Sequence, residues 1–331
     1  MASVTPAPPP FRSLLREVHR IAHRGEVRGH AERVRAMAAA LSAEGADALR
    51  VADLSARIAA ALVRRLASLF EAEHPAPAPW AWLALGSEAR REQPLPTDQD
   101  HALAFAPASG AAAWARALAE RLGEDLEAAG LPPCAGGLVA SRWHAELGTW
   151  CRRLEAWMDD PEPQAVLSAA TLADVRRIAG RLDLGSLEAA LARAADHPRF
   201  LRELARAALQ FRPPASVLVR LGLAELDRAA VAPAILLARV YGLAARSPAR
   251  GTCARLRAAR DAGLLGGDAA DAAAAAFRFL VELRFRNDLR AGKAAGSLRL
   301  GPLPPREREG TLRAVRAILQ LRERAAHRFL R

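Results

Sequence analysis

Apolar residues recur at helical spacing over much of the chain. Near the start, Leu14, Val18 and Ile21 lie three or four residues apart. This period places apolar side chains on one face of a helix. It predicts a helical N-terminal arm over residues 11–74, preceded by a Pro-rich tail at residues 1–10 that we expect to be disordered.

One short region departs from the helical pattern. The prolines of HPAPAPW (74–80) end the arm, because successive prolines cannot continue a helix. WLALGS (82–87) then predicts a strand ending in a tight turn, and DQDHALAF (98–105) predicts a second strand. The pattern returns to a helix at 111–129. We expect a small core with a mixed sheet over residues 75–185.

The remainder of the chain is helical in pattern. We also expect a strand around 172–175 within the core, and an all-helical C-terminal domain over residues 186–331. The predicted helices of that domain are 186–195, 198–210, 228–245, 252–262, 269–291 and 305–330. The fold class predicted from these elements is α+β.

Composition narrows the class of protein. Apolar residues make up 51% of the 331 residues, which is typical of a globular protein. No stretch is long and apolar enough to span a membrane, and the start lacks the features of a secretory signal, so we expect a cytoplasmic protein. Cys134, Cys151 and Cys253 are far apart and odd in number, which argues against a disulfide framework or a structural zinc site.

The formal net charge of +12 raises the question of whether the chain binds nucleic acid. The basic residues are nearly all arginines and are spread along the whole length. The chain has no run of five basic residues and no interleaved aromatic residues for base stacking, so general nucleic-acid binding is disfavoured. A small anionic substrate such as a nucleoside triphosphate (NTP) suits the same charge.

An acidic pair stands out within this basic chain. Asp98 and Asp100 are two residues apart, so in a strand their carboxylates share one face. Like charges that close repel unless a cation lies between them. The pair therefore either holds a metal such as Mg²⁺, which prefers hard oxygen ligands, or marks a solvated turn.

The residues before the pair suit a phosphate. Gly86 and Ser87 follow the first predicted strand, with ten residues between Ser87 and Asp98. Glycine lets the backbone approach a phosphate closely, and a serine hydroxyl can bind triphosphate oxygens. Arg90 and Arg91 can neutralise phosphate charge with bidentate geometry, although they could equally be surface residues.

This combination resembles a known family. The segments LGSEARREQ (85–93) and TDQDHAL (97–103) are similar to a bacterial branch of the DNA polymerase β-like nucleotidyltransferase superfamily. That branch comprises signal-transduction nucleotidyltransferases related to the N-terminal part of protein-PII uridylyltransferases. The family usually reads GSEGRREQ and TDQDNA, so the chain departs from it at Ala89 and His101.

The resemblance extends beyond the central motif. PPCAGGLVAS (132–141) resembles a C-P-G-G segment of the family, and ADVRRIAG (173–180) resembles its D-x-R segment. The match implies that Asp174 is a third metal carboxylate and that Arg176 contacts phosphate.

The helical part of the chain is also similar to the family's substrate-binding domain. The similar segments are RPP (212–214), APAILLARVYGL (232–243) and FRFLVELRFRNDLRAG (277–292). Where the family often has D-L-K, the chain reads Glu225-Leu226-Asp227.

The resemblance implies a Mg²⁺-dependent transferase that moves a nucleoside monophosphate from an NTP to an acceptor hydroxyl, releasing pyrophosphate. Asp98, Asp100 and Asp174 would hold Mg²⁺, and Gly86, Ser87 and the arginines would hold the triphosphate. The acceptor implied by the relatives is a protein, as in uridylylation of a PII-like protein. Two alternatives stay open: a nucleotide-binding regulatory module that has lost catalysis, and a transferase acting on RNA ends.

Two residues near the motif have simpler interpretations. His101 is one position from Asp100 along a strand and points to the opposite face, which favours a structural histidine over a catalytic base. Cys134 is more simply explained as a small buried residue than as a nucleophile.

Overall fold

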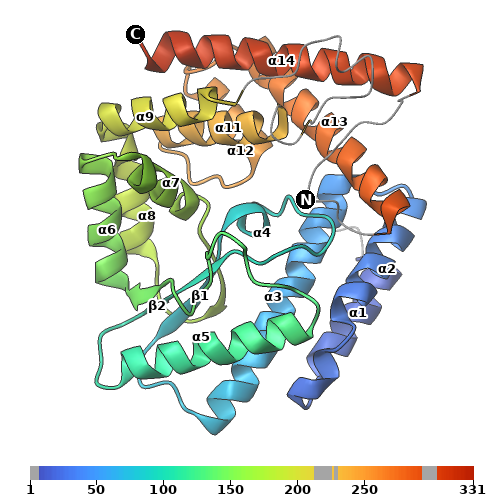
Figure 1. Cartoon of the computed structure of the whole chain (residues 1–331), viewed down its shortest axis with the longest axis vertical. Helices are drawn as coiled ribbons and strands as arrows, with labels where there is room; N and C mark the ends of the chain where they lie inside the picture. Colours follow the sequence, from blue (N-terminus) through green and yellow to red (C-terminus); the bar gives the residue numbers. More distant parts are fainter. Residues whose placement is uncertain (1–6, 212–225, 227–229, 293–303) are drawn as a thin grey trace, which may run out of the picture. The chain divides into compact units, whose positions relative to one another are not determined.

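The computed structural model describes residues 7–211, 226, 230–292 and 304–331 (Figure 1). The chain divides into two compact units. The first unit consists of Met1–Trp150 and Val175–Leu184, and the second of Cys151–Asp174 and Gly185–Arg331. The segment Cys151–Asp174, which we predicted from the sequence as part of the core, therefore groups with the C-terminal helices.

Helices open the first unit, as the apolar spacing predicts. Their bounds are α1 (Pro9–Arg20), the 3₁₀ turn η1 (Arg24–Val27), α2 (His30–Ala43) and α3 (Ala48–Glu73). Asp47 caps α3 by accepting a hydrogen bond from the Arg50 N–H at 2.9 Å. Pro9 and Pro10 are part of α1 and not of a disordered tail, because the first helical turn tolerates proline.

A four-stranded mixed sheet forms the centre of the first unit. Its strands are β1 (Trp80–Ala84), β2 (His101–Phe105), β3 (His144–Glu146) and β4 (Arg176–Gly180), in the order β3-β2-β1-β4. β1 pairs antiparallel with both β2 and β4, whereas β2 and β3 are parallel. Every residue of β1 and β2 is buried.

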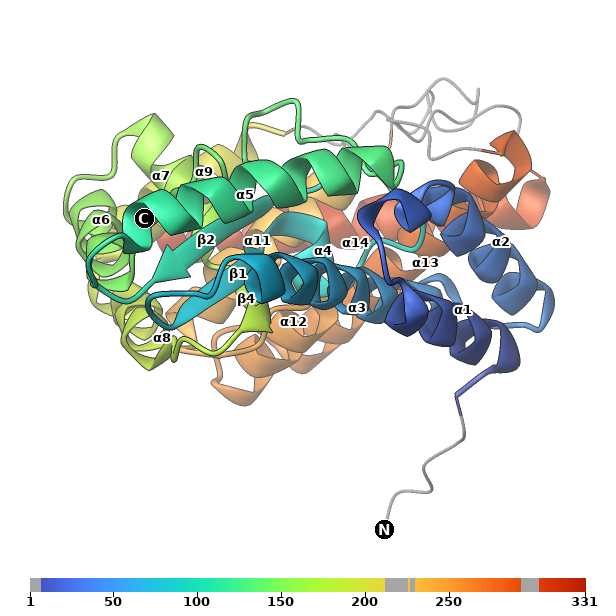
Figure 2. The same ribbon diagram turned by 90° about the horizontal axis from the view of Figure 1, so that it is seen from below.

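Two long helices pack against this sheet. α5 (Ala111–Ala128) contacts β2 and β3, α3 contacts β4, and the two helices contact each other (Figure 2). The Arg64 side chain of α3 donates a hydrogen bond to the Ile178 carbonyl in β4 at 3.1 Å. This packing explains the apolar stripe that predicts the N-terminal arm.

The last strand lies later in the chain than predicted. Residues up to Leu172 belong to α7 (Pro163–Leu172), and β4 begins at Arg176. A short apolar run fits a helix as well as a strand, so periodicity alone could not separate them. β4 ends at Gly180, where φ is +80° and a side chain would collide with the Trp80 carbonyl.

The second unit is helical, as predicted. Its elements are α6 (Leu147–Asp159, which begins in the first unit), α7, α8 (Gly185–Ala192), η2 (Arg193–Asp196), α9 (Pro198–Leu209), α11 (Ala232–Ala244), α12 (Thr252–Asp261), α13 (Gly267–Ala291) and α14 (Pro305–Phe329). Buried side chains of α9 and α11–α14, including Leu237, Tyr241 and Leu321, form its core.

The observed elements confirm the predicted α+β class with a small mixed sheet and a helical C-terminal region. The RPP segment and the pair Glu225 and Asp227 lie outside the described residues. In the part of the chain that is described, no helix is both long and apolar enough to cross a membrane.

Candidate active site

The acidic pair lies immediately before β2. Between the two aspartates, Gln99 forms a bridge with Pro133, and its N–H donates to the Pro132 carbonyl at 3.0 Å. The Asp100 carbonyl accepts a hydrogen bond from the Leu85 N–H at 2.9 Å. These bonds hold the aspartates in an extended segment that leads into the strand.

The two aspartates and one cysteine come together there. One ligand atom from each of Asp98, Asp100 and Cys134 lies within 4.8 Å of the other two. Asp98 is exposed, and the other two side chains are half-buried. Two carboxylates at this separation can bind one divalent cation, whose charge would offset their mutual repulsion.

Gly86 packs directly against this group. It has φ of +54°, a conformation that glycine adopts more readily than other residues. A methyl group at this position would overlap the Asp100 carboxylate. The glycine after β1 therefore leaves the space that the Asp100 side chain occupies.

A chain of side-chain hydrogen bonds closes the loop between α4 (Gly86–Arg90) and the aspartates. The Ser87 hydroxyl donates to Gln93 Oε1, and Gln93 Nε2 donates to the Thr97 hydroxyl. Gln93 thus links the residue predicted to bind phosphate with the residue before Asp98. Sequence reasoning did not assign this role to Gln93, although it belongs to the quoted motif.

The three arginines predicted to contact phosphate each have a partner in the protein. Arg90 pairs with Glu92 at 2.7 Å, and both side chains are only 7% exposed. The more exposed Arg91 pairs with Asp53 at 2.8 Å. Arg176 donates to two backbone carbonyls of α4, at 3.2 Å and 3.0 Å. Contact with a nucleotide would require rearrangement or sharing of these bonds.

Glu88 is the buried acidic residue of α4. Its side chain is 8% exposed, and burial raises the pKa of its carboxyl to about 7. The positive charge of Arg176 opposes this rise, and the negative charge of Asp100 adds to it. Glu88 was not predicted as a site residue, because its burial arises from tertiary packing.

Cys134 is a further residue that sequence reasoning did not assign to the site. Burial and a hydrogen bond to the Asp100 carboxylate raise the pKa of its thiol. The only available signal was the resemblance of its segment to the family's C-P-G-G motif, and that signal does not give it a role. Sulfur is a soft ligand, whereas carboxylate oxygens are hard ligands. A hard cation such as Mg²⁺ would therefore be bound mainly through Asp98 and Asp100, and Cys134 suits it less well.

Asp174 belongs to the second unit and is completely buried there. Arg239 donates to both of its carboxylate oxygens, and Arg255 donates to Oδ1. Arg255 also donates to the Ala173 carbonyl at 2.6 Å. For Asp174 to bind a metal, as the resemblance implies, these ion pairs would have to break.

His101 is buried beneath the site. Its Nδ1 accepts a hydrogen bond from the Ala140 N–H at 2.8 Å, and its ring packs against Trp82 with centroids 4.6 Å apart. Burial lowers its pKa to about 4, which keeps the ring neutral at neutral pH. These contacts agree with the structural role favoured from the sequence.

Comparison with family models identifies the relationship. Residues 32–164 match a model described as "Putative nucleotidyltransferase DUF294", and residues 198–329 match one described as "Putative nucleotidyltransferase substrate binding domain". The chain belongs to this nucleotidyltransferase family. The matches confirm the predicted family and the order of its parts, and they support nucleotidyl transfer as the general activity. No protein with a curated description matches the chain.

Proposed function

We propose that this nucleotidyltransferase uses Mg²⁺ and transfers a nucleoside monophosphate from an NTP to an acceptor hydroxyl. The observation that carries the proposal is the grouping of Asp98 and Asp100 beside Gly86, at the start of the strand next to β1. The two carboxylates would hold the ion. A bound Mg²⁺ would neutralise triphosphate charge and stabilise the departing pyrophosphate.

The residues of α4 would position the triphosphate. Gly86 and Ser87 begin α4 beside the aspartates, and the Ser87 hydroxyl can turn from Gln93 to a phosphate oxygen. The predicted phosphate contacts remain Arg90, Arg91 and Arg176. Each would exchange its present partner for a phosphate oxygen, or bind both. One of the aspartates would accept the proton of the acceptor hydroxyl.

Asp174 is kept as the third carboxylate that the resemblance implies. The contacts with Arg239 and Arg255 give it a second possible role, which is to anchor its own segment in the helical unit. The two roles make different predictions, because a metal ligand affects nucleotide binding whereas a structural ion pair affects stability.

The acceptor we propose is a protein, with a PII-like signalling protein as the case suggested by the relatives. The helical C-terminal unit, whose residues 198–329 match a nucleotidyltransferase substrate-binding domain, would present this acceptor. The positive charge is also compatible with RNA, but the sequence lacks clustered basic and aromatic residues that bind single strands.

A second candidate is a nucleotide-binding regulatory module without catalysis. The substitution of the usual D-L-K by Glu225-Leu226-Asp227, together with Ala89 in place of glycine, favours it. Tight binding of an NTP without pyrophosphate release in the presence of cell lysate would support this candidate over the transferase.

The test is calorimetric titration of the four NTPs with and without Mg²⁺. We expect Mg²⁺-dependent binding of at least one NTP to the wild type, and its loss in Asp98→Asn and Asp100→Asn because each removes a ligand charge. Asp271→Asn is the control, since that aspartate is a surface residue of the second unit. Undiminished binding in both site variants would contradict the proposal.

A further inference from the structure

The segment that contains Cys134 runs alongside the segment that contains the aspartate pair. Gln99, which lies between the two aspartates, forms a parallel bridge with Pro133, and its N–H donates to the Pro132 carbonyl at 3.0 Å. Cys134 follows Pro133 as Asp100 follows Gln99. In paired extended segments, residues at matching positions turn to the same side, so this pairing brings the thiol to the carboxylate.

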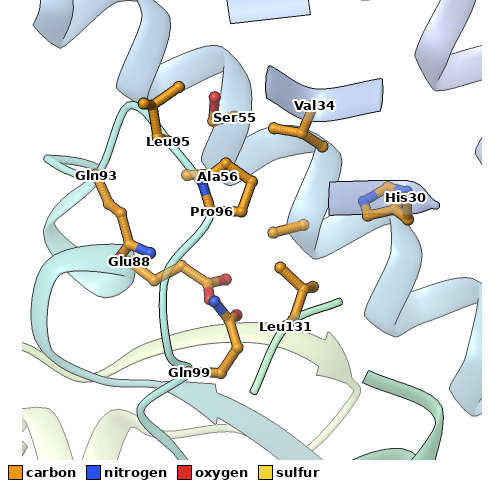
Figure 3. Close-up of a pocket in the computed structure, with 11 residues that line it drawn as sticks. His30, Val34, Ser55, Ala56, Glu88, Gln93, Leu95, Pro96, Gln99 and Leu131 are labelled. Atoms are coloured by element: carbon orange, nitrogen blue, oxygen red, sulfur yellow. The ribbon is translucent and has the colours of Figure 1, made fainter. Parts of the chain in front are cut away.

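The side chain of Gln99 turns the other way, into a separate small pocket (Figure 3). That pocket has a volume of about 30 Å³, which is room for about one water molecule. Water thus accounts for His30 Nδ1 and Glu88 Oε1, the two buried atoms there for which the described residues supply no partner. Because side chains alternate along an extended segment, the aspartates on either side of Gln99 point away from this pocket.

Asp98, Asp100 and Cys134 together form a ligand set with two hard oxygens and one soft sulfur. All three belong to the first unit, and one ligand atom of each lies within 4.8 Å of the other two. In a tetrahedral zinc site, bonds of about 2.0–2.3 Å place the ligand atoms roughly 3.5 Å apart. Small side-chain movements would therefore bring these three atoms to one ion.

The surroundings of Cys134 favour a metal-bound thiolate over a free one. Burial and a hydrogen bond to the Asp100 carboxylate raise the pKa of the thiol, and the backbone N–H groups of Leu138 and Gly136, which donate to its sulfur, act in the opposite direction. A divalent cation between the thiol and the carboxylates would replace repulsion by attraction. The thiol proton would then pass to solvent, and the two N–H groups would stabilise the bound sulfur.

The nature of the third ligand separates two kinds of cation. Mg²⁺ takes oxygen ligands, so Cys134 adds little to its binding. Zn²⁺ binds cysteine sulfur as well as carboxylate oxygen, and it generally binds a given site more tightly than the harder divalent ions do. Three protein ligands would leave the fourth position of a tetrahedral zinc ion for water.

We propose that Zn²⁺ binds to Asp98, Asp100 and Cys134 in competition with Mg²⁺. Zn²⁺ would gain the thiolate as a third ligand, whereas Mg²⁺ would be held through the carboxylates. Cys134 would thereby make nucleotide transfer sensitive to zinc. This regulatory consequence rests on the proposed function, but zinc binding itself does not.

The test is absorption spectroscopy with Co²⁺ as a coloured probe for the zinc site. Titration of the whole chain with Co²⁺, under a phosphine reductant, should produce a thiolate-to-cobalt charge-transfer band in the near ultraviolet. Zn²⁺ added afterwards should abolish the band by displacing Co²⁺. Increasing Mg²⁺ should raise the apparent dissociation constant for Co²⁺, because the two ions share the carboxylates.

Cysteine variants identify the sulfur ligand. Cys134→Ser should lose the charge-transfer band and should bind Zn²⁺ about tenfold or more weakly in calorimetry, because a metal ligand is removed. Cys151→Ser and Cys253→Ser are the matched controls and should keep the band, since both cysteines belong to the second unit.

Aspartate variants identify the oxygen ligands. Asp98→Asn and Asp100→Asn should each weaken Co²⁺ binding about tenfold or more, since each removes a charged ligand. Asp271→Asn, at the surface of the second unit, should bind Co²⁺ as the wild type does.

Several results would overturn the proposal. They are the absence of a charge-transfer band in the wild type, an undiminished band in Cys134→Ser, wild-type affinity for Co²⁺ in both aspartate variants, and an affinity for Co²⁺ that Mg²⁺ does not change. If the band depends on Cys134 but no NTP binds, the zinc site stands and the proposed function fails. If an NTP binds with Mg²⁺ but no band forms, the zinc site fails and the proposed function stands.

Discussion

Gly86 matters both for the conformation of the backbone after β1 and for the position of the Asp100 side chain. Its positive φ would strain any other residue, and its lack of a side chain leaves room for the Asp100 carboxylate. A positive φ is common to several glycines of the chain, whereas the close approach to the Asp100 carboxylate is specific to Gly86. A pair of variants can separate them.

We predict that Gly86→Ala is more damaging than Gly110→Ala. Gly110 also has a positive φ, of +76°, but a side chain there would meet nothing within 4 Å. Both variants should lose roughly 1 kcal/mol of stability from backbone strain. Only Gly86→Ala should also displace Asp100 and weaken Mg²⁺-dependent nucleotide binding about tenfold or more.

Urea unfolding and calorimetry of both variants provide the measurement. Equal losses of stability together with equal nucleotide affinities would show that the contact between Gly86 and Asp100 has no consequence. If no NTP binds the wild type, the unfolding comparison alone still tests the steric part of the prediction.

At this scale, sequence reasoning succeeded where the relevant residues are close together in the chain. Gly86, Asp98 and Asp100 fall within one hairpin, so spacing and strand geometry predict that they are neighbours. Cys134 and Glu88 could not be assigned in this way. Their surroundings depend on which distant segments pack against them, and a single sequence does not supply that packing.

At the scale of elements, the segment between α7 and β4 contains the D-x-R motif. Asp174 ends the part of the chain that groups with the helical unit, and Arg176 begins β4 in the first unit. The D-x-R motif therefore spans the boundary between the two units. Its aspartate pairs with Arg239 of α11 and Arg255 of α12.

We predict that Asp174→Asn destabilises the second unit by roughly 3 kcal/mol or more. Removing one partner of a buried ion pair leaves uncompensated charge, and here two guanidinium groups lose their counter-ion. The measurement is urea unfolding followed by circular dichroism. The control is Asp196→Asn, because the Asp196–Arg246 pair is exposed and should matter little.

The same variant tests the role that the resemblance implies for Asp174. Loss of Mg²⁺-dependent nucleotide binding with full stability would favour the third metal ligand over the structural ion pair. Loss of stability with nucleotide binding retained in the folded protein would favour the ion pair.

The helices of this chain were easier to predict than its strands. The long helix α3 repeats its apolar positions many times, so the helical period is clear there. β4 has five residues, and the apolar run before it is long enough for a helix of its own. Local pattern could not decide between them, because β4 is selected by its pairing with β1.

At the scale of the whole molecule, the two units are interleaved along the chain. The segment Cys151–Asp174 belongs to the second unit, and the chain then returns to the first unit. There β4 completes the sheet by pairing with the edge of β1 that β2 does not cover. The N–H groups of Arg181 and Leu182 then donate to the Trp80 carbonyl, at 2.8 Å and 2.9 Å. The first unit therefore cannot be cut out as one continuous segment.

We predict that a fragment of residues 1–150 aggregates, because without β4 the edge of the buried strand β1 is left unpaired and exposed. The matched fragment is residues 1–184 with a flexible linker in place of 151–174, which restores β4. It should be monomeric by size-exclusion chromatography and should unfold cooperatively in urea. A monomeric, cooperatively folded 1–150 fragment would show that the first unit folds without β4. The return of the chain to the first unit would then serve to place Arg176 beside α4 more than to complete the sheet.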